Sequence, residues 1–549
     1  MTARCLLFLA TLRFWRLLTL LSIGAACLTG VLPIPSLHAD ELINKALVSE
    51  KRRDWLEACR FYDKSLRKDR NQQEVRDAYQ RCLRRLYLVR RCQDRVYKEA
   101  LARLTPSEAL EVYDQVLVVV GAAYVDASKT DINTLFQQGV QELRYDFDEE
   151  VFIQEYLSGA RPATVARFKR VLDGWTTHKV KSRTEAREEV LALIQAARRA
   201  DLDVKALAVA VGLEFASGAC NALDEYTLFL TPGYYNDVQA ALQGKYVSIG
   251  VDLGASEDQR VEIVRIYPKS PAQEAGLGEH DRILRIDREE ALSPEASAEK
   301  LRGGDGSMVE VEVQAVGQMT SRVVRLQRRP VYLPSVMEPQ LMALPTDMGS
   351  ITVGMIQINH FQDSTVQDVK EALAQLQTAG VKALLLDLRG NPGGAFKAGV
   401  QVAELFLNEG VIVFSESPLD EYNRPFKVTA RNPVQVPMVV LVDRDTASAA
   451  EVVAGALKEH RQGTTLIVGQ TTFGKGSIQG VIPLDKAPLD KTPGGIRITV
   501  AKLFSPGKHQ PYTGRGVTPD IVVEQEGDAV TAAGVQALIQ LLKSSMMMR

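Results

Sequence analysis

A serine and a lysine in the last third of the chain have the types and setting for nucleophilic chemistry. Ser448 lies in the stretch T-A-S-A-A-E, and Lys475 follows 27 residues later in F-G-K-G-S-I-Q. A serine hydroxyl becomes a good nucleophile when a neighbouring base removes its proton. A lysine can be that base only if burial lowers the pKa of its amine from about 10.4 toward neutrality. We therefore expect Lys475 to be a buried general base and Ser448 its nucleophile.

Both residues also have purely structural interpretations. Ser448 and Glu451 have the S-x-x-E spacing of a capping box, in which the serine only caps the helix that follows. A lysine in a solvated loop would stay protonated at neutral pH and could not act as a base. The chemical interpretation therefore depends on the two segments lying together in the fold.

A glycine-rich loop, R-G-N-P-G-G at residues 389–394, could hold negative charge near these residues. Glycines let the backbone turn sharply and let amide N–H groups approach a ligand closely. The loop follows a predicted strand and precedes a predicted helix, whose first N–H groups are unpaired. By itself this is a weak signal, because many glycine-rich turns have no further role.

The chain that carries these loops alternates strands with helices. Such alternation predicts a partly parallel sheet covered by helices, with functional loops at the strand ends. The predicted strands are residues 351–358, 383–388, 438–442 and 465–468, and the predicted helices are residues 366–377, 396–406 and 449–460.

Earlier parts of the chain have different patterns. Residues 40–215 have apolar positions at helical spacing, with a good helix start at Thr105-Pro106. Residues 55–85 could form one tetratricopeptide-like helix pair, but no second copy follows in register, which favours plain helical packing. The pattern of residues 244–329 predicts short strands around a helix that begins at Pro271 and ends at Gly276. The strands expected there are residues 247–253, 261–266, 281–286, 308–316 and 322–326.

Five ordered stretches together resemble the C-terminal processing peptidases, also called tail-specific proteases. They are T-A-S-A-A-E and F-G-K-G-S-I-Q, L-D-E-Y-T-L-F-L-T-P at 223–232, L-D-L-R-G-N-P-G-G at 386–394, and the segment 505–521. The resemblance covers roughly residues 130–525. It implies a serine endopeptidase that uses a Ser-Lys dyad and cleaves protein substrates near their C-termini without a cofactor.

The resemblance also implies roles for particular residues. Ser448 would form an acyl-enzyme, Lys475 would serve as base and then as acid, and Gln479 would orient the lysine. The oxyanion would be held by the N–H group of Ala449 and by one from Gly393 or Gly394.

Residues 244–330 resemble a PDZ domain of the kind found in bacterial proteases. Such a domain receives a terminal carboxylate on exposed backbone N–H groups and adds the peptide as a strand to a sheet edge. The resemblance implies that this domain binds substrate tails and gates the active site; a small scaffold module with an unused groove is the alternative. The matching peptide-binding residues are Tyr246, Val247, Ser248, Ile249, Gly250 and Val251.

The fold class predicted from all of this is multidomain α+β, with a C-terminal α/β core of the ClpP and crotonase type. A crotonase-type acyl-CoA enzyme and a non-proteolytic PDZ-containing scaffold are the rival interpretations. The expected divisions are a signal segment 1–39, a helical region 40–130, a helical part of the protease 131–243, a PDZ domain 244–330, a protease core 331–527 and a C-terminal helix or tail 528–549.

The N-terminus is typical of an exported protein. Arg4, Arg13 and Arg16 precede an apolar run at residues 17–32, and Leu37-His38-Ala39 offers a cleavage site before Asp40. We expect export to the periplasm or cell envelope, with the leader either removed or kept as a membrane anchor. Cysteines outside this segment could pair or remain single; they are Cys59, Cys82, Cys92 and Cys220.

Composition narrows the list of partners. The formal net charge of -2 offers no basic field for nucleic acid. No spacing of histidine, aspartate, glutamate or cysteine suggests a metal site, and the scattered histidines offer no rival base; His360, nearest the predicted sheet, is expected to pack or line the cleft. The expected partners are protein tails, and the N-terminal helices are candidates for self-association or for docking an adaptor.

Overall fold

The computed structural model describes residues 37–547, apart from residues 70–71, 203–204, 257, 259, 333, 347–348, 430–431 and 485–493. The chain divides into two compact units, one ending at Leu83 and the other beginning at Arg84. Most of the expected signal segment, residues 1–36, lies outside the described residues. Among those that are described, no helix combines the length and the apolar character needed to cross a bilayer.

The first unit is built on a helix hairpin. Helices α2 (Leu37–Lys51) and α3 (Trp55–Lys68) pack together, and α4 (Gln73–Gln93) begins in this unit. Asp54 caps α3 by accepting from the N–H group of Glu57, and the buried Tyr62 hydroxyl donates to Glu50 at 2.9 Å.

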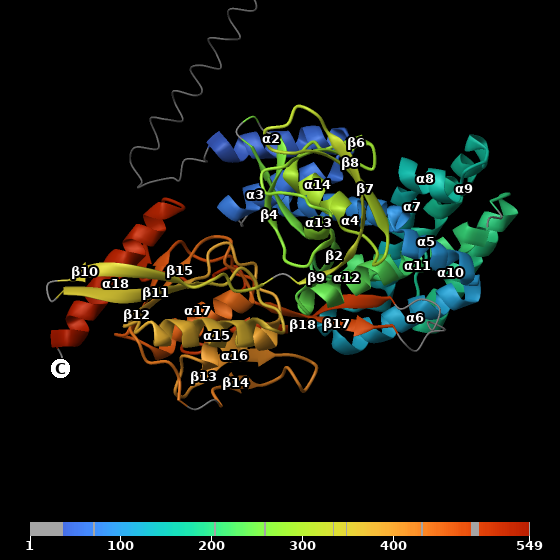
Figure 1. The fold of residues 1–549 in the computed structure, drawn as a ribbon. Helices are drawn as coiled ribbons and strands as arrows, with labels where there is room; N and C mark the ends of the chain where they lie inside the picture. The colour runs from blue at the N-terminus through green and yellow to red at the C-terminus, as the bar shows by residue number, and fades with distance from the viewer. Residues whose placement is uncertain are drawn as a thin grey trace, which may run out of the picture. The chain divides into compact units, whose positions relative to one another are not determined.

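The second unit begins with a helical region, in which α11 (Lys205–Asn221) packs against α6 (Pro106–Ala123) and α7 (Ile132–Asp146) (Figure 1). Gly218 of α11 lies so close to α7 that a Cβ atom on it would be 2.5 Å from the Gly139 Cα atom. The helices on either side of residue 130 therefore share one bundle. Its remaining helices are α5 (Arg95–Arg103), α8 (Glu150–Tyr156), α9 (Pro162–Trp175) and α10 (Arg183–Arg199).

A small β-rich part follows, with strands in the order β3-β4-β5-β7-β8. The strand expected at 247–253 is interrupted: β2 (Lys245–Ser248) pairs with β9 (Arg329–Tyr332), and β3 (Val251–Ala255) joins the main sheet as its edge strand. Gly250, between them, has φ +80°, and a Cβ atom there would be 2.2 Å from the Ser270 Cβ atom. The other elements are β4 (Val261–Ile266), α13 (Pro271–Glu274), β5 (Arg282–Ile286), β6 (Glu289–Glu290), α14 (Pro294–Leu301), β7 (Met308–Gln314) and β8 (Arg322–Gln327).

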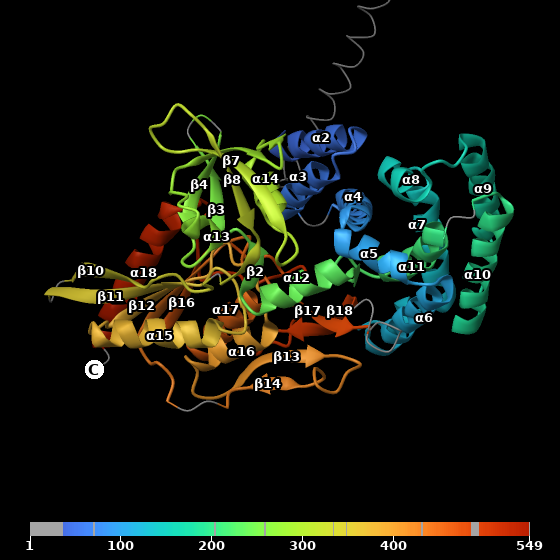
Figure 2. The ribbon, with the colours of Figure 1, turned by 45° about the vertical axis from the view of Figure 1, so that its right-hand side comes forward.

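The last part is a six-stranded sheet in the order β10-β11-β12-β15-β16-β19, parallel except for β10. Its strands are β10 (Gln340–Thr346), β11 (Gly349–Gln357), β12 (Ala383–Asp387), β15 (Met438–Val442), β16 (Thr465–Gly469) and β19 (Ile521–Val522). Helices α15 (Thr365–Thr378), α16 (Phe396–Glu404) and α17 (Ala449–His460) cover one face, and α18 (Asp528–Met547) covers the other (Figures 1 and 2).

This two-sided cover explains the continuous apolar runs of β12 and β15, because alternate side chains of a strand point to opposite faces. Leu384 and Leu386 pack into the core beneath α15 to α17, whereas Leu385 packs against the α18 side. The strand predicted at 438–442 and the helix predicted at 449–460 are confirmed to the residue. The other core elements predicted from the alternation are confirmed with ends shifted by one or two residues.

A second sheet joins segments from both sides of the β-rich part. Strand β1 (Leu228–Leu230) pairs with β18 (Gly495–Phe504), which also pairs with β13 (Val411–Glu416) and β17 (Ser477–Pro483), while β14 (Pro425–Lys427) pairs with β13. Helix α12 (Pro232–Leu242) connects β1 to β2. The segment before the β-rich part is therefore a structural member of the C-terminal region.

Candidate active site

Ser448 occupies a strained turn between a buried strand and a helix. It connects β15 to α17 and has φ +56° and ψ -117°, a conformation that non-glycine residues seldom adopt. The flanking Ala447 and Ala449 are buried, and the small side chains leave the turn uncrowded. Such strand-turn-helix geometry presents a serine hydroxyl beside the unpaired N–H groups of a helix start.

One buried carboxylate connects this turn to the lysine loop. Glu451 is 1% exposed, and its Oε2 atom accepts from the N–H groups of Ser448 at 2.7 Å and Lys475 at 2.8 Å. Its Oε1 atom accepts from the N–H group of Gly474 and from the hydroxyl of Thr472, both at 2.6 Å. The backbones at residues 448 and 475 therefore meet at a single oxygen atom.

Glu451 is satisfied by neutral donors rather than by an ion pair. Burial raises the pKa of its carboxyl group, and the four hydrogen bonds that it accepts work in the opposite direction. The carboxylate thus belongs to the capping pattern that the sequence suggested, but it also receives three donors from a loop more than twenty residues away.

The Lys475 side chain is half-buried, and its amine is largely removed from water. Burial is the main cause that lowers the pKa of its amine to about 8, and the charge of Arg497 lowers it further. Asp224, Glu225 and Glu451 act against this shift. The Nζ atom lies 4.5 Å from the centre of the Tyr226 ring. A substantial fraction of this lysine is therefore uncharged in mildly alkaline solution.

Gln479 lies in β17, close in sequence to the lysine loop. Its side-chain amide donates to the hydroxyl of Ser477 at 2.9 Å and to that of Thr499 at 3.4 Å. Among the hydrogen bonds of the described residues, none joins the Lys475 amine to the side chain of Ser448 or Gln479.

The glycine loop lies against the serine turn. A Cβ atom on Gly393, whose φ is +95°, would be 2.7 Å from the Ser448 Cβ atom and 3.0 Å from the backbone nitrogen of Ala449. The N–H group of Gly393 donates to Asn391 Oδ1 at 2.8 Å. Within the described part of the chain, the N–H groups of Gly394 and Ala449 donate no hydrogen bond. These two donors remain available to a ligand.

Two polar residues fix the glycine loop to the serine turn. The carboxylate of Asp443 accepts from the N–H group of Gly390 at 2.9 Å and from that of Thr446, also at 2.9 Å. The Asn391 carbonyl oxygen accepts from the N–H group of Ala447 at 2.9 Å. These hydrogen bonds therefore connect the two loops directly.

Sequence reasoning missed these connecting residues. Glu451 was interpreted only as a capping partner, and nothing in the spacing of Asp443 or Asn391 indicates a contact between loops. Tyr226 lies within the stretch 223–232 that was singled out, but no local pattern joins it to Lys475.

The expected peptide-binding residues are divided between two elements. Tyr246 to Ser248 belong to β2, Ile249 is fully buried, and Val251 begins the edge strand β3, against which α14 packs. The Gly250 N–H group donates to the Ser248 hydroxyl at 3.0 Å.

The remaining candidates lie elsewhere. His360 contacts the Gln362 side chain at 2.7 Å, and the four cysteines outside the leader are buried. The residues that the structure describes hold no cluster of side chains suited to a metal ion.

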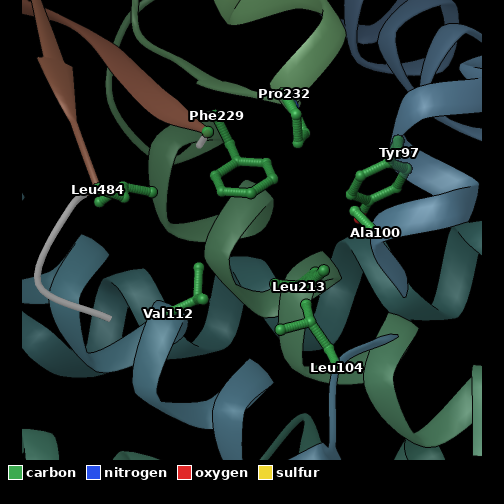
Figure 3. A pocket seen from close by; sticks show the side chains of 9 residues that line it. Tyr97, Ala100, Leu104, Val112, Leu213, Phe229, Pro232 and Leu484 are labelled. Carbon is green, nitrogen blue, oxygen red and sulfur yellow. The ribbon is translucent and has the colours of Figure 1, made fainter. Parts of the chain in front are cut away.

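An apolar cavity in the second unit is unrelated to these loops. It is small, about 20 Å³, which is room for roughly one water molecule. Figure 3 shows its lining, which includes Tyr97, Leu104, Val112, Leu213 and Phe229 and none of the site residues above.

Several features of this site are typical of a hydrolase that uses an activated serine: a partly exposed serine in a strained turn, two available N–H donors and a half-buried lysine. The model of Peptidase family S41 matches residues 352–523. A carboxyl-terminal-processing protease of Synechocystis sp. is 34% identical over 55% of this chain and 69% of its own length. One of Picosynechococcus sp. is 32% identical over 58% of this chain and 74% of its own.

Among solved structures, a photosystem II D1 C-terminal processing protease is similar with a TM-score of 0.41 and 24% identity, over 78% of this chain and 96% of its own. From the sequence relatives, the chain belongs to the carboxyl-terminal processing proteases of peptidase family S41, and it is a serine-type peptidase.

Proposed function

We propose that the protein is an endopeptidase in which Ser448 is the nucleophile and Lys475 the general base. The neutral amine takes the hydroxyl proton as Ser448 Oγ attacks the scissile carbonyl carbon. The resulting ammonium gives that proton to the departing amine nitrogen, which leaves an acyl-enzyme. A water molecule, deprotonated by the same amine, then releases the new C-terminus.

The observation that carries this proposal is the shared carboxylate of Glu451. It accepts hydrogen bonds from the backbone at both Ser448 and Lys475, so the nucleophile turn and the base loop cannot separate without breaking buried bonds. The lysine pKa of about 8 adds to this support. At pH 7, roughly a tenth of such an amine is uncharged and able to act as a base.

We assign the oxyanion site to the N–H groups of Ala449 and Gly394. The sequence left Gly393 and Gly394 as alternatives; Gly393 is the weaker choice because its N–H group is already bonded to Asn391. Each donor of this kind is worth about 3 kcal/mol of the barrier. Gly393 would instead allow the close approach of its loop to Ser448, where a side chain has no room.

Gln479 is proposed to orient the lysine during the reaction. It follows the Lys475 loop on β17 and pairs in register with Thr499, two positions from the pair formed by Val481 and Arg497. Its side-chain carbonyl oxygen would accept a hydrogen bond from the Lys475 amine when substrate is bound. Gln479→Ala is expected to lower kcat more than it raises KM.

The β-rich part is proposed to act as the PDZ domain that captures substrate tails and gates the active site. Its edge strand β3 lies beside α14, an arrangement that suits an added peptide strand. Substrates would be proteins with accessible C-terminal tails. The charged and apolar leader sequence favours export to the cell envelope.

The test uses the purified chain and an unstructured protein substrate with a free C-terminus. Ser448→Ala and Lys475→Met should each reduce cleavage to background while the circular dichroism spectrum stays unchanged. Lys458→Met replaces a half-buried lysine of α17 that forms an ion pair with Asp520, and this control should cleave normally. Near-normal cleavage by either site variant would refute the dyad; tail binding without cleavage by the unmodified chain would favour a scaffold.

A further inference from the structure

An aromatic ring from a distant part of the sequence covers the amine of the proposed base. The Nζ atom of Lys475 lies 4.5 Å from the centre of the Tyr226 ring. Tyr226 lies between α11 and β1, on the other side of the β-rich part in sequence. Among the described residues, no hydrogen bond to this amine accompanies the ring contact.

The backbone that carries the ring is fixed on both sides. The Tyr226 N–H group donates to Asp224 Oδ1 at 3.1 Å, and the Tyr226 carbonyl oxygen accepts from Arg497 Nε at 3.0 Å. The next residue, Thr227, is buried, and its hydroxyl donates to the same Asp224 oxygen at 2.8 Å. The ring is therefore held in place by the fold rather than lying there by chance.

The charged groups around the amine come from three elements. Arg497 of β18 disfavours the ammonium, whereas Asp224 and Glu225 of the Tyr226 segment and Glu451 of α17 favour it. Burial outweighs all of these charges. The groups that keep water from the amine therefore decide whether Lys475 can accept a proton at neutral pH.

We propose that Tyr226 is a positioning residue for the general base, whose ring covers the Lys475 amine, excludes water from it and fixes it in place. This inference rests on the proposed Ser-Lys dyad. The ring acts in both halves of acylation. Before proton transfer the ring excludes water from the amine. After proton transfer the face of the ring stabilises the ammonium until the proton passes to the leaving nitrogen.

The test is the dependence of kcat/KM on pH for three forms of the full chain: the unmodified protein, Tyr226→Phe and Tyr226→Ala. The acid limb of this profile reports the ionisation of the base in the free enzyme. Phenylalanine retains the ring, so the limb should stay where it is. Alanine admits water and raises the pKa of Lys475, so the limb should move up by about one pH unit and kcat/KM at pH 7 should fall about tenfold.

A merely structural role for Tyr226 would lower activity at every pH without moving the limb. An unmoved limb in Tyr226→Ala, or an equal shift in Tyr226→Phe, overturns the inference. If the alanine variant does not fold, Tyr226→Leu takes its place. We then expect the acid limb of the kcat/KM profile to move up by about half a pH unit. An unmoved limb in the leucine variant also overturns the inference. Lys475→Met in the same assay separates the two proposals, because residual cleavage by that variant refutes the dyad itself.

Discussion

Two buried carboxylates in this molecule are stabilised in opposite ways. In the helical region, Glu214 is 1% exposed and faces the buried guanidinium of Arg91, whose Nε atom donates to it at 3.2 Å. At the candidate active site, Glu451 is equally buried but accepts four hydrogen bonds from backbone N–H groups and a hydroxyl. The charge of Glu214 is balanced by the Arg91 guanidinium, whereas that of Glu451 is stabilised by hydrogen bonds from neutral groups.

The difference matters for catalysis because a lysine lies near the second carboxylate. A direct ion pair with Glu451 would hold Lys475 in its ammonium form, which cannot remove a proton. Since N–H and O–H donors occupy both oxygens of Glu451, the carboxylate can fix the loop while the amine remains able to lose its proton. The helical region has no such requirement, and a buried ion pair is sufficient there.

The strongest test of this comparison is Glu214→Gln in the helical region. It leaves the Arg91 guanidinium buried without a counter-charge, and one of its nitrogen atoms, Nη1, already has no hydrogen-bond partner among the described residues. We expect the free energy of unfolding to fall by about 3–5 kcal/mol. Denaturant titration measures this loss, and kcat/KM of the folded fraction should stay within about twofold. A large drop in kcat/KM with unchanged stability would reverse the comparison.

The matched change at the active site is Glu451→Gln. Glutamine replaces one acceptor oxygen with an NH₂ group, which cannot accept a hydrogen bond from a backbone N–H group. The Ser448 turn and the Lys475 loop therefore lose part of their connection. We expect kcat/KM to fall about 100-fold, equivalent to about 3 kcal/mol of barrier. Steady-state kinetics with a circular dichroism control measures this. Activity within a few-fold of the unmodified enzyme would mean that the shared carboxylate does not organise the site.

Lys475→Met tests whether the buried amine reduces stability. The pKa of about 8 lies below the value of 10.5 expected when the chain is unfolded, so the folded state binds fewer protons between those values. The resulting penalty is fully present below pH 8 and disappears as the pH rises through 10.5. Methionine should therefore raise stability by about 2–3 kcal/mol at pH 7 and much less at pH 10.5, while abolishing cleavage. Denaturant titrations at both pH values measure this, and an equal gain at both would contradict the buried charge.

The smallest effect is expected at Asp146, which lies beside the Arg91 and Glu214 pair. Burial, together with the charge of Glu214, raises the pKa of its carboxyl group well above the usual value. Its Oδ2 atom lacks a hydrogen-bond partner among the described residues. The folded state therefore binds the extra proton, and stability falls as the pH rises above about 4.

Asp146→Asn should remove this dependence and raise stability at pH 7 by about 1 kcal/mol, as measured by urea unfolding between pH 4 and 8. A variant that is less stable at pH 7 would indicate that the ionised carboxylate supports the ion-pair cluster.

Much of this arrangement could be predicted from the sequence. The alternating strands and helices of the C-terminal region follow from local periodicity, and apolar β15 and its following helix were predicted to the residue. The strand predicted at 247–253 is interrupted at residues 249–250, because local periodicity gives no sign of the close contact between Gly250 and Ser270. That contact is long-range, and it ends one strand and begins another.

Short segments of the sequence already contain the residue types of the serine turn, the lysine loop and the glycine loop. The sequence alone therefore determined which groups are chemically able to react. Tertiary structure decided which of them meet: the sharing of Glu451, the use of the Gly393 N–H group by Asn391, and the placing of Tyr226 over Lys475. The physical reason is that hydrogen bonding and burial depend on distance in space. Some of the neighbours that act on the pKa of Lys475 lie more than two hundred residues away along the chain.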